Sequence, residues 1–409
     1  ILFKVFDSKE FKRSKLKKGK KHLTVILLLL ASSFGFAQNT NMSREAVIAK
    51  ALENNKGIKA AALQVNKMQE NIKSSFTFEK TNVYYSYDQN NLALNNLPLK
   101  VFGVQQRFLF PTVYGVQKKA NTSEFEKEKA DYELQKNKLS LQVAKTYEQI
   151  VYWQHQERLY SYLDSLYQNF SKASDRRFEL GETNYLEKIT AQSKYRQIKT
   201  KLTQINFEKK AQYESLQALV QSDEKISILE KELVPIPTLD TTSNKAIHTA
   251  YLESISKMYK SQISLQKQHW LPDLNLEYFQ GRNNGLSQSL YGFQVGIAVP
   301  ILFSGNVSKT KVAQLESQSW EEQKQNQEQK MTQFIRQQQN EIAKYQESIN
   351  YYNATGKKLS EEIIKVANSS YKNGEIDFFQ YIQSLENAVA IKIEYVEAVL
   401  QFNSNQLEL

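Results

Sequence analysis

The sequence contains no cysteine in its 409 residues. This absence excludes disulfide frameworks, thiol catalysis and metal sites built on cysteine. The four histidines are scattered along the chain, and no two of them have the spacing of metal ligands. We therefore expect neither a metal site nor a cofactor.

Glycine and proline are also scarce, with 13 and 6 residues. An average composition would supply about twice as many glycines and three times as many prolines. The sequence has no nucleophile elbow, no phosphate-binding loop and no convincing pair of catalytic acids. These absences argue against a loop-rich enzyme fold. They favour long uninterrupted helices and a protein that is not an enzyme.

The formal net charge of +11 is concentrated at the N-terminus. Residues 1–22 carry nine basic and two acidic residues, so the rest of the chain has a net charge of only +4. A nearly balanced body offers no electrostatic footprint for nucleic acid. The basic run precedes an apolar stretch at Leu23–Leu30 and small residues up to Ala37. This pattern is typical of a secretory signal, so we assign residues 1–37 to a signal peptide and pre-region.

Two long stretches predict helices. The 123 residues between Pro111 and Pro235 hold no proline, and neither do the 109 residues after Pro300. Both stretches are rich in Lys, Glu, Gln, Leu and Ala, with apolar residues at intervals of three and four. We expect a pair of antiparallel helices in each stretch, about 55–60 residues long, that turn near Gly181 and Gly374.

Two shorter segments, 81–110 and 273–301, predict β-hairpins. The clearest strand has a period of two, with aromatic and branched side chains on one face and small or polar ones on the other. The apolar face consists of Tyr291, Phe293, Val295, Ile297, Val299 and Ile301. In the first hairpin, Arg107 falls on the polar face with Gln105 and Gly103.

The two halves of the chain repeat each other at an offset of 193 residues. This offset relates Gly181 to Gly374, Phe110 to Phe303, and Asn82 to Asn275. We therefore predict a tandem duplication, with repeats at 38–235 and 236–409. Each repeat contains a helix, a hairpin and a long helix pair.

Four strands from one chain cannot close a barrel, whereas three chains would supply twelve. An exported chain with apolar strand faces about ten residues long suits a shared outer-membrane barrel, with the apolar face toward lipid. One alternative is a β-sandwich beside a coiled coil, with the aromatic face in its own core. Another is a periplasmic coiled-coil adaptor or structural protein of an envelope complex.

These features resemble the TolC-like outer membrane efflux protein family. The resemblance covers residues 42–409 and is carried by the duplicated layout, the strand-to-helix boundaries at Phe110-Pro111 and Phe303-Ser-Gly305, and the segments Arg177-Phe-x-x-Gly181 and Tyr371-x-x-Gly374. It implies a homotrimer with a 12-stranded transmembrane barrel and an α-helical barrel in the periplasm. It also implies efflux or type I secretion with a periplasmic adaptor and an inner-membrane pump.

The resemblance further implies roles for residues near the helix tips. Tyr371 matches a gate tyrosine and Glu187 its acidic partner, while Gln380 and Gln383 occupy positions that often carry an acidic ring. A direct Tyr371–Glu187 hydrogen bond could hold the tip shut. The segments that match adaptor-docking loops are Leu180, Gly181, Glu182 and Thr183 in the first repeat, and Asn373, Gly374, Glu375 and Ile376 in the second.

Overall fold

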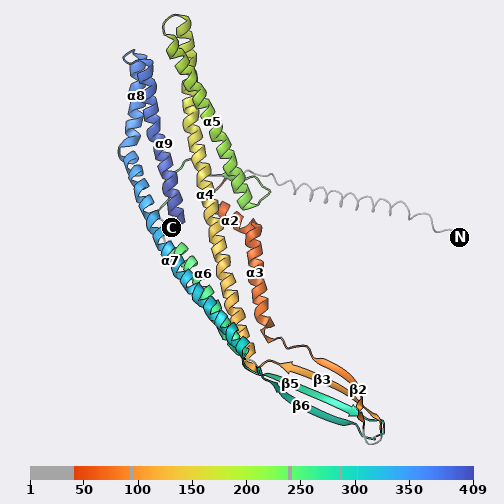
Figure 1. Ribbon diagram of the computed structural model, residues 1–409. Helices are drawn as coiled ribbons and strands as arrows, with labels where there is room; N and C mark the ends of the chain where they lie inside the picture. The colour runs from red at the N-terminus through yellow and green to blue at the C-terminus, as the bar shows by residue number, and fades with distance from the viewer. Residues whose placement is uncertain (1–40, 93–95, 238–241, 286, 302) are drawn as a thin grey trace, which may run out of the picture.

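The structure is a computed structural model that describes residues 41–92, 96–237, 242–285, 287–301 and 303–409. The assigned signal peptide lies outside these residues. The described chain is a long helical rod with a small β-sheet at one end (Figure 1). Within the described residues, no helix combines the length and apolar character needed to cross a membrane. The expected class, mainly α with a small β part and long antiparallel helices, is confirmed.

Capping residues set the boundaries of the first-half helices. Pro111 occupies the first helical position, where its missing N–H costs nothing. Asn55 ends one helix and caps the next, because its Oδ1 accepts from the Gly57 and Ile58 N–H groups. The helical segments are α2 (Arg44–Asn54), α3 (Lys56–Lys73), the short 3₁₀ helix η1 (Ser74–Phe76), α4 (Pro111–Glu179) and α5 (Tyr185–Val220).

The second-half helices repeat these boundaries. They are α6 (Thr242–Gln268), α7 (Ser304–Tyr351), the π-helical turn η2 (Tyr352–Gly356), α8 (Lys357–Lys372) and α9 (Phe378–Glu408). Helices α7 and α9 begin 193 positions after α4 and α5. The expected length of 55–60 residues is wrong, because α4 has 69 residues and α5 has 36. Helix α5 stops early where Gln221 adopts a left-handed conformation at φ 53°.

The sheet has the order β2-β3-β5-β6, with β2 (Asn82–Leu92), β3 (Pro98–Phe108), β5 (Asp273–Arg282) and β6 (Leu290–Ala298). All neighbouring strands are antiparallel, and both expected hairpins form. The central β3–β5 pairing joins the two hairpins. In this four-stranded sheet, β2 and β6 are the edge strands.

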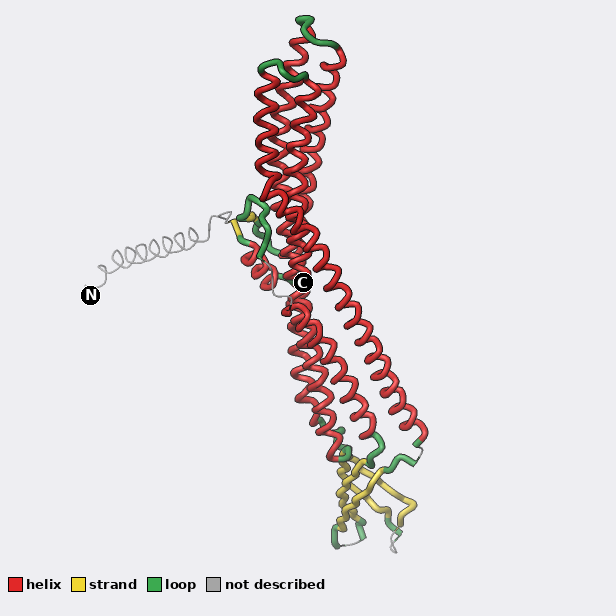
Figure 2. Tube along the Cα trace, turned by 90° about the vertical axis from the view of Figure 1, so that its left-hand side faces the viewer, coloured by secondary structure: helices red, strands yellow, loops and turns green. Residues whose placement is uncertain are grey.

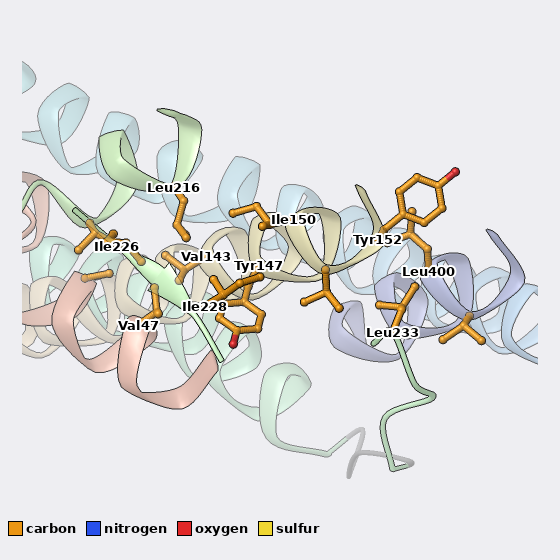
Figure 3. Packing of buried hydrophobic residues seen from close by; sticks show 14 of the residues in the cluster. Val47, Val143, Tyr147, Ile150, Tyr152, Leu216, Ile226, Ile228, Leu233 and Leu400 are labelled. Carbon is orange, nitrogen blue, oxygen red and sulfur yellow. The ribbon is translucent and has the colours of Figure 1, made fainter. Parts of the chain in front are cut away.

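The largest core lies midway along the rod (Figure 3). Val47, Val143, Ile150 and Leu216 are fully buried there, where α2 and α5 pack against α4. The short parallel pair β1 (Asn41–Met42) and β4 (Ser227–Ile228) covers this core on one side of the rod (Figure 2). The Tyr147 hydroxyl donates to the Met42 carbonyl oxygen at 2.9 Å, which ties the pair to α4.

The elements form a single curved layer with two lateral edges (Figure 1). Above the core the order across the layer is α5, α4, α9, α8, and below it α3, α4, α6, α7. The sheet continues this order as β2, β3, β5, β6. One edge therefore runs along β2, α3 and α5, and the other along β6, α7 and α8. The α4–α5 tip lies farther from the sheet than the α8–α9 tip, and the η2 turn interrupts the shorter column.

Candidate functional site

One face of the sheet is apolar and exposed in the single chain. Tyr291 and Phe293 are 77% and 79% exposed, and Val295 and Ile297 share their face by the period of two. Cross-strand partners lie on the same face of a sheet, and the register adds further exposed apolar residues: Val83, Tyr85, Phe102, Leu276 and Tyr278. Val299 and Ile301 are also exposed and follow the end of β6. The apolar face thus spans all four strands.

The opposite face carries the polar and charged side chains. Arg107 lies there, as the period of two predicts, and pairs with Asp273 and, at 3.8 Å, with Glu79. Sequence reasoning missed the hydrogen bond that the Tyr84 hydroxyl donates to Glu277. These two residues are 193 positions apart and therefore occupy equivalent positions of the repeat. That equivalence was the available signal, because the β3–β5 pairing places equivalent strands near each other.

The two helix tips have the same backbone structure. Gly181 and Gly374 adopt left-handed conformations at φ 72° and 76°. The Glu182 N–H donates to the Arg177 carbonyl oxygen at 2.8 Å, and the Glu375 N–H makes the equivalent bond at 2.8 Å. Each tip is therefore a Schellman motif, which ends one helix and reverses the chain into the next. The turns expected at these two glycines are confirmed.

The first tip carries an ion pair that reaches toward the second. The Arg177 guanidinium donates to Glu187 Oε1 at 3.0 Å, and the Thr183 hydroxyl donates to Oε2 of the same carboxylate. Tyr371 stacks on Tyr381 with 4.7 Å between ring centroids. Burial raises the pKa of Tyr371, the nearby Arg177 charge opposes this rise, and Glu187 adds to it. Tyr371 and Glu187 therefore meet at one place, where both interact with Arg177.

The second tip is neutral at the equivalent positions. Gln380 forms a capping box with Asp377, in which each side chain accepts from the backbone N–H of the other. Gln383 donates to Asn387 at 2.9 Å on the surface of α9. Gln380 is 193 positions after Glu187 and Ser370 is 193 after Arg177, so the second repeat lacks both charges of the first.

The other tip residues lie at the end of the rod. Leu180, Glu182 and Glu375 are exposed, and both Glu182 and Glu375 follow the left-handed glycines. The Glu375 carboxylate accepts from the Ser370 hydroxyl at 2.8 Å. The remaining residues of the two expected docking loops, Asn373, Thr183 and Ile376, flank these turns.

A buried polar network in the middle of the rod was not found from sequence. Asn403 is fully buried and donates to Glu148 Oε2 and to the Val234 carbonyl oxygen, both at 2.9 Å. Its own oxygen accepts from the Ile236 N–H at 2.9 Å. Arg44 pairs with the same Glu148 carboxylate at 3.1 Å. Burial raises the pKa of Glu148, and the bonds from Asn403 and Arg44 oppose that rise. The network fixes the segment between the two repeats against α4 and α9.

Within the part of the chain that the structure describes, no group of three or more His, Asp or Glu side chains is arranged to hold a metal ion. The functional features are therefore the two-faced sheet, the paired tips and the two open lateral edges.

No protein-family model matches the chain, and no curated protein sequence matches it. Solved structures do match it in fold. The chain aligns with CusC, described with transmembrane channel formation, at a TM-score of 0.75 and 14% identity, covering 90% of this chain and 91% of that one. It aligns with the Campylobacter jejuni outer membrane channel CmeC at 0.74 and 15% identity, covering 91% and 84%. The outer membrane protein VceC of Vibrio cholerae gives 0.73 and 15%, covering 89% and 94%. The predicted resemblance is therefore confirmed at the level of the fold.

Proposed function

We propose that this chain is an outer membrane channel that assembles as a homotrimer and carries small molecules out of the cell. It works in a tripartite efflux or type I secretion system, together with a periplasmic adaptor and an inner-membrane pump. The observation that carries the proposal is the four-stranded sheet, with one exposed apolar face and two open edges, at the end of a helical rod. The shared fold with outer membrane channels supports it.

The two open edges favour a ring. They carry different elements, so they are joined head to tail when copies associate, and a head-to-tail contact closes into a ring when the rotation permits. In such a ring β2 of one copy pairs with β6 of the next. Three copies supply twelve strands of 9 to 11 residues, which is the length that spans a bilayer. A barrel of that size has room for a water-filled lumen.

The two faces of the sheet then have separate roles. The apolar face, with Phe293 and Val295, contacts lipid, and the face with Arg107 and Glu277 lines the lumen. Helix α4 has 69 residues and is therefore about 100 Å long. The α-helical barrel formed by three rods continues the lumen through the periplasm. Its far end is closed by the tips, where the adaptor docks and where Arg177, Glu187 and Tyr371 form the gate.

A matched pair of lysine substitutions tests the assignment of the faces. Val295 and Gln294 are neighbours on opposite faces of β6. We expect Val295→Lys to reduce the amount of trimer in outer membranes, since a lysine facing the bilayer midplane costs about 2–4 kcal/mol. Gln294→Lys should assemble normally. Equal effects of the two variants would contradict the lipid assignment.

Two measurements on the unmodified protein test the whole proposal. An outer-membrane fraction should contain a trimer whose electrophoretic mobility changes on heating, and the purified trimer should conduct ions in planar bilayers. A monomer that stays in solution without detergent and forms no channels would overturn the proposal. That result would favour the adaptor or structural protein considered from the sequence.

A further inference from the structure

The lower part of the two lateral edges carries complementary side chains that nothing in the single chain covers. On one edge, Phe76 and Phe78 beside α3 are 55% and 57% exposed. On the other, Val312 and Leu315 of α7 are 54% and 52% exposed. Exposed apolar side chains of this size on both edges mark a contact surface.

The two edges also differ in charge. Helix α3 carries four lysines and one glutamate. The segment 312–328 of α7 carries four glutamates and one lysine. Lys67 and Glu322 are exposed, and neither forms an ion pair within the described part of the chain. Each edge therefore offers a charge of the sign that the other edge lacks.

The hydrogen bonds between helices give the relative heights of these residues. Thr112 of α4 donates to Gln268 of α6, and these helices run antiparallel. Twelve residues farther from the sheet on each helix, Ser256 is level with residue 124 of α4. Trp320 of α7 donates to Ser256 at 3.1 Å and so lies at that same height.

The same procedure places α3. Asn121 of α4 donates to the Asn71 carbonyl oxygen at 2.9 Å. Residue 124 is therefore level with Met68, and Trp320 with it. Glu322 lies two residues beyond Trp320, or about 3 Å at the rise of an α-helix. Lys67 and Glu322 are thus at the same height on opposite edges, to within one helical turn. Phe76 and Leu315 coincide in height in the same way.

We propose that the α3 edge of one copy docks on the α7 edge of a second copy. Phe76 and Phe78 pack against Val312 and Leu315, and Lys67 forms an ion pair with Glu322 across the seam. This inference rests on the proposed trimer and identifies the surface that joins its subunits. The partner is a second copy of the chain, because both complementary surfaces lie on the same molecule at matching heights.

Cross-linking tests the seam directly, because the chain has no cysteine of its own. In the Lys67→Cys, Glu322→Cys double variant, a short bifunctional thiol reagent should produce covalent dimers and trimers on denaturing gels. Neither single variant should produce trimers. The matched control combines Lys67→Cys with Glu316→Cys, since Glu316 is also an exposed glutamate but lies six residues away on another side of α7. It should cross-link severalfold less.

A charge exchange gives an independent measurement. Lys67→Glu and Glu322→Lys should each lower the yield of heat-modifiable trimer severalfold, and the double exchange should restore it. A channel that still forms trimers and conducts, but shows no Lys67–Glu322 cross-link and no restoration, would overturn the seam and leave the proposed function intact. Absence of both trimer and conductance in the unmodified protein would instead remove the proposed function.

Discussion

Arg177 and Glu187 form an ion pair across the turn that joins α4 to α5, with 3.0 Å between Nη1 and Oε1. The pair is partly exposed, so its contribution to stability is small, about 0.2–1 kcal/mol. Its position beside Tyr371 gives it a second possible effect, on the opening of the tip. The sequence suggested a latch of Tyr371 and Glu187, and the structure adds Arg177 as the side chain that both of them meet.

We expect the Tyr371→Phe, Glu187→Gln double variant, and separately Arg177→Gln, to raise single-channel conductance in planar bilayers. Each removes polar contacts that hold the tips together, while thermal stability should change little. Lys188→Gln is the control, because Lys188 pairs with Asp175 within the first helix pair at 3.5 Å. Unchanged conductance in the double variant would count against Tyr371 and Glu187 as a latch.

Gly103 and Gly296 are equivalent in the repeat but differ in their surroundings. A Cβ atom on Gly103 would lie 2.3 Å from the ring of Tyr84, whereas on Gly296 the nearest atom is 3.8 Å away. We expect Gly103→Ala to displace Tyr84 and lose its bond to Glu277, at a cost of about 1–3 kcal/mol. Gly296→Ala should be tolerated. The temperature at which the trimer dissociates on gels measures both, and equal temperatures would refute the prediction.

Asn403 should contribute strongly to stability because it is buried and uses both its donor and its acceptor groups. Asn403→Ala leaves Glu148 and two backbone groups without this partner, which should cost about 2–3 kcal/mol. Asn405→Ala is the control, since Asn405 donates only to the Gln401 carbonyl oxygen of its own helix. Urea unfolding followed by circular dichroism should separate the two variants. Similar midpoints would show that the network contributes little.

His155 should make stability depend on pH. Burial lowers its pKa, Arg158 lowers it further, and Glu232 partly opposes them. The folded state therefore binds this proton more weakly than the unfolded state. The resulting stabilisation is present above the unfolded pKa of about 6.5 and is lost as pH falls toward the folded pKa. His155→Gln should lose less stability than the unmodified chain between about pH 7.5 and 5.5. His269→Gln, at an exposed turn, should behave like the unmodified chain.

Much of the fold follows from local chemistry. Gly181 and Gly374 stand out in helix-forming stretches, and a left-handed turn at a glycine is a local property. The two faces of β6 follow from the period of two. The approximate positions of the hairpins and long helices could therefore be predicted without any knowledge of contacts.

The features that could not be predicted depend on partners distant in sequence. Asn403 and Glu148 are separated by 255 residues, and neither residue type signals burial. The end of α5 at Gln221 and the π-helical turn at Tyr352–Gly356 have no glycine or proline pattern that distinguishes them from continuous helix. The expectation of equal helices was wrong for this reason.

The unequal reach of the two helix pairs has a consequence for the rim of the assembled protein. In a ring of three chains, the farther α4–α5 ends and the nearer α8–α9 ends alternate around the circumference. The rim is then a crown with three tall and three short teeth, rather than a flat sixfold surface. An approaching protein meets the tall teeth first, so its first contacts are with the loop at Leu180 and Glu182, and those at Glu375 follow.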